Sequence, residues 1–270
     1  MKLHRQPSIF LPHGGGPWPW VPPMRAMHGA MASYLEGLIA KLPERPKAVL
    51  MVSAHWEAAR PTLAAAARPP MLYDYSGFPK ETYSVSWPAP GAPNLVGEVE
   101  SLLATAGFIA VRDDARGFDH GTFVPMALAN PLADMPTLQL SLLASLDAVK
   151  HLAMGRALAP LRDQGVLIIG SGMSYHNLAE LMRSMRTPQK TIQASTYFDE
   201  WLCETLSANP SQRETGLADW AQAPMARAAH PREEHLLPLH VCAGAGGEDV
   251  ATFPYRDVVL GAQVSAVQFG

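Results

Sequence analysis

Three apolar segments of this chain each lead into a histidine. Residues 8–12 precede His13, residues 48–53 precede His55, and residues 166–169 lead through Gly170-Ser-Gly172 to His176. Short apolar runs bounded by turn residues are typical of strands that are buried on both faces of a parallel sheet. Ligands bind outside the carboxyl ends of such strands. The pattern predicts an α/β fold in which three imidazoles converge, and it suggests a metal centre.

The rest of the chain alternates in the same way. The apolar runs and proline positions predict helices at 28–42, 94–106, 149–163 and 191–206, and strands at 47–53, 108–111, 137–142, 166–169 and 263–269. A proline-rich stretch at 61–93 is expected to form an ordered excursion over the sheet edge, a polar segment covers 208–232, and a further helix begins near Glu233. We predict a single domain over 1–270, with a central mostly parallel or mixed sheet flanked by helices.

Composition narrows the range of partners. The 270 residues are 48% hydrophobic and carry a formal net charge of −3 without basic clusters, which argues against nucleic acid or an anionic membrane and favours a small substrate. Cys203 and Cys242 lack CxxC spacing, so neither a disulfide nor a thiolate site is indicated and a reducing cytoplasm fits. Neither a signal peptide nor a membrane span is expected, which predicts a soluble protein.

Each histidine motif also has a simpler interpretation. His13 lies in Leu11-Pro-His-Gly-Gly-Gly-Pro17, where the glycines allow a sharp turn, and it could merely hydrogen-bond locally. A phosphate loop is disfavoured because Pro17-Trp-Pro-Trp20 follows in place of a helix start with lysine. His55, at the end of a buried strand, could be a core residue. Glu57 could be an outer partner of the site or merely solvated, and we favour the latter.

His176 follows the Gly-Ser-Gly segment, which we expect to form a turn. The G-x-S-x-G elbow of serine hydrolases fails here, because the last position of Gly172-Met-Ser-Tyr-His176 is histidine. Glu234 and His235, if helical, would point about 100° apart, so one metal would take one or the other. Glu233 fits an acidic first helical turn, and His120 lies between Asp119 and Gly121 in an expected loop. His4, His28, His151 and His240 are expected at the surface or in helix packing.

Taken together, these segments resemble the class III extradiol ring-cleavage dioxygenases, in particular their 4,5-DOPA extradiol dioxygenase-like branch. The matching stretches are Leu11-Pro-His-Gly-Gly15, Ser53-Ala-His-Trp56, Tyr73-Asp-Tyr-Ser-Gly-Phe-Pro79, Trp87-Pro-Ala-Pro-Gly91, Asp119-His-Gly121, Gly170-Ser-Gly172 with His176-Asn-Leu178, and His230-Pro231 with Glu234, His235 and Pro238. Each motif is weak alone, but their order along the chain is specific.

The resemblance implies one divalent metal at the C-terminal ends of the strands. By motif, His13 and His55 become ligands, and His235 stands where protocatechuate-type relatives have a glutamate ligand. Three neutral nitrogens suit Zn(II) as well as Fe(II). His176 matches the family's base and could also be a fourth ligand. His120 matches a catalytic histidine that contacts the substrate.

The implied substrates are a small catechol, DOPA-like or related, and O2. Phe123 stands where the family often has tryptophan, which predicts an altered pocket shape, and Tyr73 and Phe123 are expected to contact the substrate. Tyr73, Tyr75, Phe78 and Trp87 are candidates for an aromatic wall. Two alternatives stay open. One is a zinc-dependent hydrolase that activates water on the same histidines, and the other is a non-catalytic metal-containing binding protein of the same fold.

Overall fold

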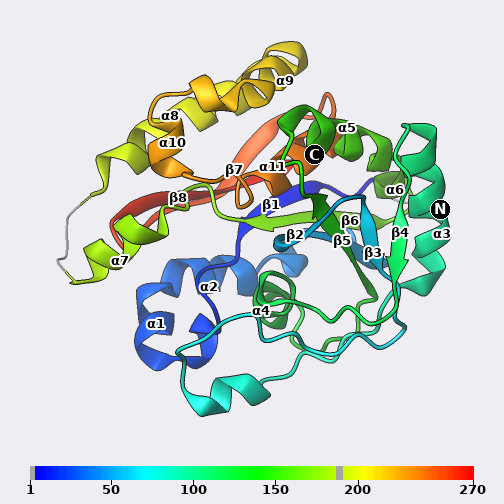
Figure 1. The fold of residues 1–270 in the computed structure, drawn as a ribbon, viewed down its shortest axis with the longest axis horizontal. Helices are drawn as coiled ribbons and strands as arrows, with labels where there is room; N and C mark the ends of the chain where they lie inside the picture. Colours follow the sequence, from blue (N-terminus) through cyan, green and yellow to red (C-terminus); the bar gives the residue numbers. More distant parts are fainter. Residues whose placement is uncertain (1–3, 187–190) are drawn as a thin grey trace.

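A computed structural model describes residues 4–186 and 191–270. Its centre is an eight-stranded mixed sheet with the strand order β4-β3-β5-β2-β6-β1-β8-β7 (Figure 1). The strands are β1 (Ser8–Pro12), β2 (Ala48–Ala58), β3 (Thr62–Ala64), β4 (Val111–Asp113), β5 (Thr137–Leu143), β6 (Val166–Gly172), β7 (Ala251–Val259) and β8 (Ala262–Phe269). The predicted α/β fold is confirmed.

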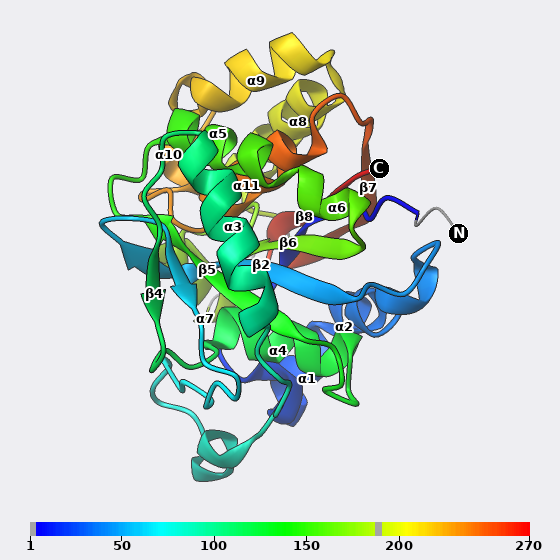
Figure 2. The ribbon, with the colours of Figure 1, turned by 90° about the vertical axis from the view of Figure 1, so that its right-hand side faces the viewer.

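The four central strands are parallel and buried. β2 pairs in parallel with β5 and β6, and β6 pairs in parallel with β1. A parallel sheet needs cover on both faces. α5 (Ala148–Leu158), α11 (Leu237–Gly246) and α3 (Pro93–Thr105) lie on one face, whereas α2 (Gly29–Glu36) and α4 (His120–Ala129) lie on the other (Figures 1 and 2). The C-terminal ends of β1, β2 and β6 therefore open at one edge of the sheet.

The remaining helices surround this core. They are α1 (Pro22–Met27), α6 (Pro160–Asp163), α7 (Leu178–Arg186), α8 (Gln193–Ser207), α9 (Pro210–Ala218) and α10 (Ala226–Ala229), with 3-10 turns at Trp18–Trp20, Ile39–Lys41, Lys80–Ser84 and Trp220–Gln222. Cys203 and Cys242 are both free, as expected. No helix among the described residues is both long and apolar enough to cross a bilayer.

The segment Gly170-Ser-Gly172 is strand, so the predicted turn is wrong. Both glycines belong to β6, and each lies against another part of the backbone. A Cβ on Gly170 would lie 2.4 Å from the carbonyl oxygen of Pro238, and one on Gly172 would lie 2.1 Å from that of His235. The glycines therefore allow the segment that leads into α11 to lie directly on β6.

The strand before His55 also extends further than predicted. β2 continues to Ala58 and contains His55, with an irregularity in its pairing to β5 between Val52 and Glu57. Within this bulge the hydroxyl of Ser53 accepts a hydrogen bond from the His55 amide at 3.2 Å. The bulge changes the direction in which the side chains at the end of the strand point.

Several other boundaries differ. The helix predicted at 28–42 ends at Glu36, the one predicted at 149–163 divides at Pro160 into α5 and α6, and the helix expected from Glu233 begins only at Leu237. His120 is not in a loop but is the first residue of α4. The polar segment 208–232 contains α9 and α10, and α1, α7, β3 and β7 are further elements without a predicted counterpart.

The proline-rich stretch forms an ordered excursion, as expected. It begins with β3 and then follows irregular backbone, anchored by bridges between Met71 and Phe118 and between Gly91 and Thr137. In Figure 2 this segment, drawn in cyan to teal, lies below the sheet on the side of α1 and α4. It is therefore placed beside the edge at which the histidine-bearing strands end.

Candidate metal centre

Five histidines from distant parts of the chain meet at this edge. The His13 ring lies 4.8 Å from that of His55, 5.4 Å from that of His120 and 5.3 Å from that of His235. His176 stacks on His235 at 3.4 Å. Their atoms form two adjoining groups that could hold a metal ion, His13 with His55 and His120, and His176 with Glu234 and His235. All five histidines that the sequence singled out for the site are thus brought together.

The orientation of His13 is set by Ser171 in β6. The Ser171 hydroxyl donates to the carbonyl oxygen of Gly121 and lies 3.0 Å from His13 Nδ1. Since its one proton goes to the carbonyl, the hydroxyl must accept from Nδ1–H, and this leaves Nε2 of His13 without a proton. Pro125, four residues after Gly121, has no N–H for that carbonyl, so Ser171 satisfies both groups.

Asp74, in the proline-rich excursion, contacts the rings of His120 and His55 through its carboxylate. Asp74 Oδ1 lies 2.8 Å from Nδ1 of His120, and Oδ2 lies 3.7 Å from Nδ1 of His55. Burial raises the pKa of Asp74, but hydrogen bonds from His120 outweigh it and hold the pKa below its usual value. A carboxylate is an acceptor only, so His120 carries its proton on Nδ1.

Glu234 likewise contacts two imidazoles, those of His235 and His176. Its Oε1 lies 2.9 Å from Nδ1 of His235 and 3.4 Å from Nδ1 of His176. Although burial opposes ionisation, hydrogen bonds from these two histidines lower the pKa of Glu234. Glu234 and His235 lie in a turn before α11, so the helical argument for choosing between them does not apply. The contacts make Glu234 an outer partner of two imidazoles.

An ion pair behind Glu234 links it to β2. Arg232 contacts both carboxylate oxygens of Glu57 at 2.6 Å and Glu234 Oε2 at 3.3 Å. The expectation that Glu57 is simply solvated is wrong, because its charge is paired with Arg232. This chain of charges joins the end of β2 to the turn that carries His235.

Asp119 is a site residue whose importance the sequence did not reveal. It is fully buried, and its Oδ1 accepts from Ser53 Oγ at 2.7 Å and from the Thr122 amide at 3.2 Å. Its Oδ2 lies 3.1 Å from Arg116, which also donates to the His55 carbonyl at 3.2 Å. Asp119 therefore caps α4 at His120 and fixes the β2 bulge at His55. Its sequence signals were its place in the Asp119-His-Gly121 motif and its suitability as an N-cap before an unrecognised helix, and neither indicates the contacts with Ser53 and Arg116.

The imidazoles suit a divalent cation. Burial, followed by repulsion between neighbouring histidines, lowers the pKa of His13 and of His55, and burial lowers the pKa of His235 to about 4. These rings are therefore neutral near pH 7, as metal ligands must be. Nε2 of His13 and Nε2 of His55 face each other at 3.0 Å, an arrangement that requires a proton or a cation between two lone pairs. The donor set fits a nitrogen-liganded metal.

Two of the predicted wall residues, Tyr73 and Tyr75, lie on either side of Asp74, and their contact with a substrate stays a prediction. The ring of Tyr75 lies 5.9 Å from that of His120, and the ring of Tyr73 lies 5.9 Å from that of Phe123. The ring of Phe78 packs against Gly16 of the glycine turn, where an added Cβ would lie 2.7 Å from it. Phe123 is fully buried and packs against the ring of Tyr73, and its contact with a substrate stays a prediction.

Trp87 does not belong to the wall. It is buried against Phe118, and its indole nitrogen donates to the carbonyl oxygen of Asn130 at 2.9 Å. A tryptophan that is satisfied in this way is a core residue. Its prediction as a wall residue is therefore wrong.

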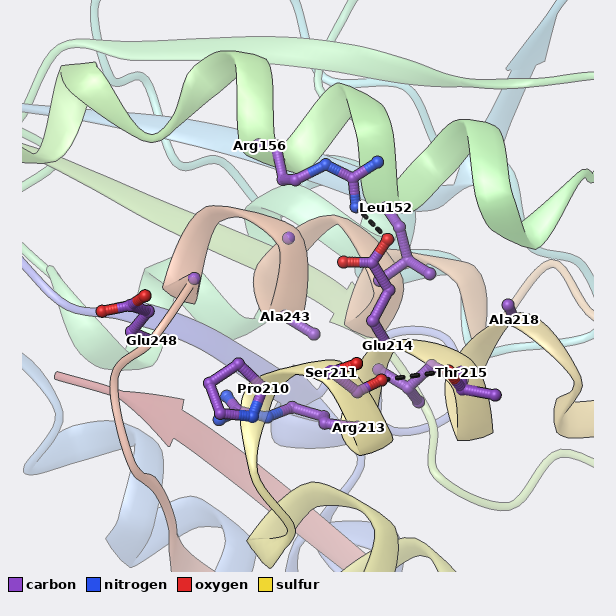
Figure 3. Close-up of a pocket in the computed structure, with 13 residues that line it drawn as sticks. Leu152, Arg156, Pro210, Ser211, Arg213, Glu214, Thr215, Ala218, Ala243 and Glu248 are labelled. Atoms are coloured by element: carbon purple, nitrogen blue, oxygen red, sulfur yellow. Dashed lines mark hydrogen bonds and ion pairs between the residues drawn. The ribbon is translucent and has the colours of Figure 1, made fainter.

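The remaining buried histidines bond to backbone carbonyls. The rings of His28, His151, His230 and His240 contact the carbonyl oxygens of Met24, Asp147, Ser174 and Leu217. A separate groove of about 570 Å³ lies between α5, α9 and α11, and its residues Arg156 and Glu214 pair at 2.8 Å (Figure 3). None of the five site histidines lines this groove.

Comparison with known proteins places this chain in one family. Residues 25–267 match the family model described as the catalytic LigB subunit of aromatic ring-opening dioxygenase. The chain is 40% identical to the 4,5-DOPA dioxygenase extradiol of Beta vulgaris over 90% of this chain and 87% of that protein. It is 31% identical to the protein of that name from Escherichia coli, over 100% of this chain and 97% of the relative. A crystal structure of an uncharacterized Escherichia coli K12 protein has a TM-score of 0.78 at 29% identity, covering 98% of this chain and 100% of that one.

Proposed function

The chain belongs to the LigB family and is an extradiol ring-cleavage dioxygenase, and on that premise we propose that it opens the ring of a catechol with O2 at one divalent metal. The observation that carries the proposal is the convergence of five imidazoles, whose Nδ1 atoms each lie within 3.7 Å of an oxygen of Ser171, Asp74 or Glu234. Such outer partners orient histidine ligands and fix their tautomer.

The metal would be held by His13, His55 and His235, and the His176 variant described below decides whether His176 is a fourth ligand. The donor atoms of His13 and His55 group with that of His120, and the His55 ring is nearer to His120, at 3.9 Å, than to His235, at 4.9 Å. The choice of His235 as the third ligand therefore rests on the resemblance to the family alone. Fe(II) in this site would supply the redox chemistry that O2 activation needs, whereas Zn(II) has no accessible redox change.

The proton transfers fall to the residues around the metal. A catechol must lose at least one proton to bind through both oxygens, and a neutral imidazole is a suitable acceptor. His176 has a side chain that is 23% exposed and lies against His235, so it can meet an entering hydroxyl group. Glu234 would stabilise the resulting imidazolium. His120, beside Tyr75, has a bare Nε2 that would accept the second hydroxyl proton, and either imidazolium, that of His176 or that of His120, could return its proton as the ring opens.

Oxygen uptake tests the proposal. Anaerobically prepared protein loaded with Fe(II) or Zn(II) is supplied with a panel of catechols, including DOPA, while dissolved O2 and the yellow absorbance of a ring-opened semialdehyde are recorded. We expect both signals with Fe(II) alone. Turnover of an ester or amide without O2 consumption would instead support the zinc hydrolase, and catechol binding without product would support the binding protein.

Variants assign the roles. His176→Ala should reduce turnover far more than metal content if His176 is a base, whereas equal loss of both would make it a ligand. His13→Ala and His55→Ala should each abolish metal content and turnover together. Stoichiometric metal in either protein would overturn the ligand set. Ser184→Ala serves as the matched control, since it removes a buried hydroxyl from α7 that belongs to neither of the two candidate metal-binding groups.

A further inference from the structure

Asp74 lies at the centre of the Tyr73-Asp-Tyr75 segment, and the proton transfers above give it no direct role. The amide of Leu72 donates to the carbonyl oxygen of Phe118 at 2.8 Å, which ties this part of the excursion to the residues before α4. The side chain of Asp74 is 20% exposed and turns inward toward the histidine cluster. A charged side chain from a surface loop is thereby brought against His120.

The carboxylate makes two contacts with one residue. Asp74 Oδ1 accepts from the backbone N–H of His120 at 2.9 Å and lies 2.8 Å from Nδ1 of the same residue. The backbone N–H belongs to the first turn of α4, where amides have no partner inside the helix. The backbone and the ring of His120 are thus held by a single oxygen, which fixes the rotation of the imidazole.

This contact determines what His120 offers to a substrate. With its proton on Nδ1, the ring has a bare Nε2 that can accept a proton or hydrogen bond from a hydroxyl group. The opposite tautomer would present an N–H at that position and could only donate. Because the side chain of His120 is only 8% exposed, water cannot readily replace the carboxylate as its partner.

The loop that carries Asp74 is held independently of this contact. The Tyr73 hydroxyl donates to the carbonyl oxygen of Val85 at 2.7 Å, and the Tyr75 hydroxyl donates to that of Thr82 at 2.6 Å. These bonds lie on either side of Asp74 and close the excursion on itself. Loss of the Asp74 carboxylate alone should therefore leave the backbone of the loop in place.

We propose that Asp74 is a positioning residue that holds His120 in the Nδ1–H tautomer, with Nε2 free to act on a bound hydroxyl group of the substrate. The catalytic half of this inference rests on the proposed function, whereas the tautomer does not. Asp74→Asn keeps an oxygen that can accept from both the amide and Nδ1, since the two N–H groups of His120 select the amide oxygen over its NH2. Asp74→Ala removes the acceptor.

The first test is long-range 1H–15N correlation spectroscopy of the metal-free protein labelled with 15N-histidine, with the His120 signals assigned by their absence in His120→Gln. We expect the Nδ1–H tautomer in the wild type and in Asp74→Asn, and a shift toward Nε2–H in Asp74→Ala. An Nε2–H signal in the wild type, or an unchanged Nδ1–H signal in Asp74→Ala, would overturn the proposal. The wild-type spectrum decides even if Asp74→Ala fails to fold.

The second readout is steady-state turnover of the Fe(II) enzyme. General acid–base catalysis contributes about 10²–10⁴-fold, so we expect kcat of Asp74→Ala to fall at least about tenfold while Asp74→Asn restores most of it. KM for the catechol should change little, because the aromatic residues beside Asp74 stay in place. The control Ser76→Ala alters an exposed side chain of the same loop. A rise in KM at unchanged kcat would contradict the proposal and make Asp74 a structural part of the wall. If the wild type turns over no catechol, the proposed function fails while the spectrum still decides the tautomer.

Discussion

Ser171→Ala tests the link between fold and site. The hydroxyl of Ser171 is fully buried and is the partner of two groups, His13 Nδ1–H and the Gly121 carbonyl. His13 is only 1% exposed, so water cannot reach its ring to replace the lost bond. A buried polar group left without a partner costs about 1–3 kcal/mol, so the two together should lower the free energy of unfolding by about 2–6 kcal/mol.

The same change should weaken metal binding. Without its acceptor, His13 is free to carry its proton on Nε2, the atom that faces His55. Removing an outer partner of a metal-binding histidine lowers metal affinity by about 10–100-fold. Urea unfolding of the metal-free protein and Zn(II) competition with a chromogenic chelator measure the two effects, with Ser184→Ala as the control for a buried hydroxyl. Unfolding free energy and Zn(II) affinity both equal to those of the wild type would refute the reasoning.

Three further changes examine separate parts of the structure. His235→Ala should abolish metal binding whereas His120→Ala retains it, and the reverse result in metal analysis would exchange their roles. Phe123→Trp enlarges a fully buried ring beneath Tyr73 and should cost about 1–3 kcal/mol in urea unfolding, and an unchanged midpoint would show spare room there. Burial lowers the pKa of His230 to about 3. Between that pH and about 6.5, the usual pKa of histidine, the unfolded state binds a proton that the folded state does not. Stability therefore falls as the pH falls through this range. His230→Gln should reduce that slope by about 1.4 kcal/mol per pH unit between about pH 5.5 and 4, and a slope equal to that of the wild type would contradict the assignment.

The buried strands were predictable because their signal is local. β1, β2, β5 and β6 are short apolar runs bounded by turn residues, and such runs are evident without knowledge of the fold. α4 gave no signal, since it is buried on nearly every side and lacks an amphipathic pattern, and it contains Pro125. β7 is an edge strand with Pro254 and exposed positions, which hides its strand character.

The candidate site, like the fold, was predictable from the sequence only in part. The five histidines could be identified from motifs, because each lies in a short stretch with its own composition. Their partners could not, since Ser171 is 158 residues from His13 and Asp74 is 46 residues from His120. The role of Glu234 depended on the true start of α11, which sequence periodicity placed too early. Tertiary pairing, rather than local pattern, determines which nitrogen of each imidazole is free.

The most direct test of ring cleavage is to run the Fe(II) enzyme under 18O2 and analyse the ring-opened product by mass spectrometry. Extradiol cleavage places oxygen from O2 in the product, and the account predicts label in the carboxyl group formed at the broken bond, with one O2 consumed for each catechol. Product whose new oxygen comes only from labelled water, or catechol loss with release of hydrogen peroxide and an intact ring, would contradict it.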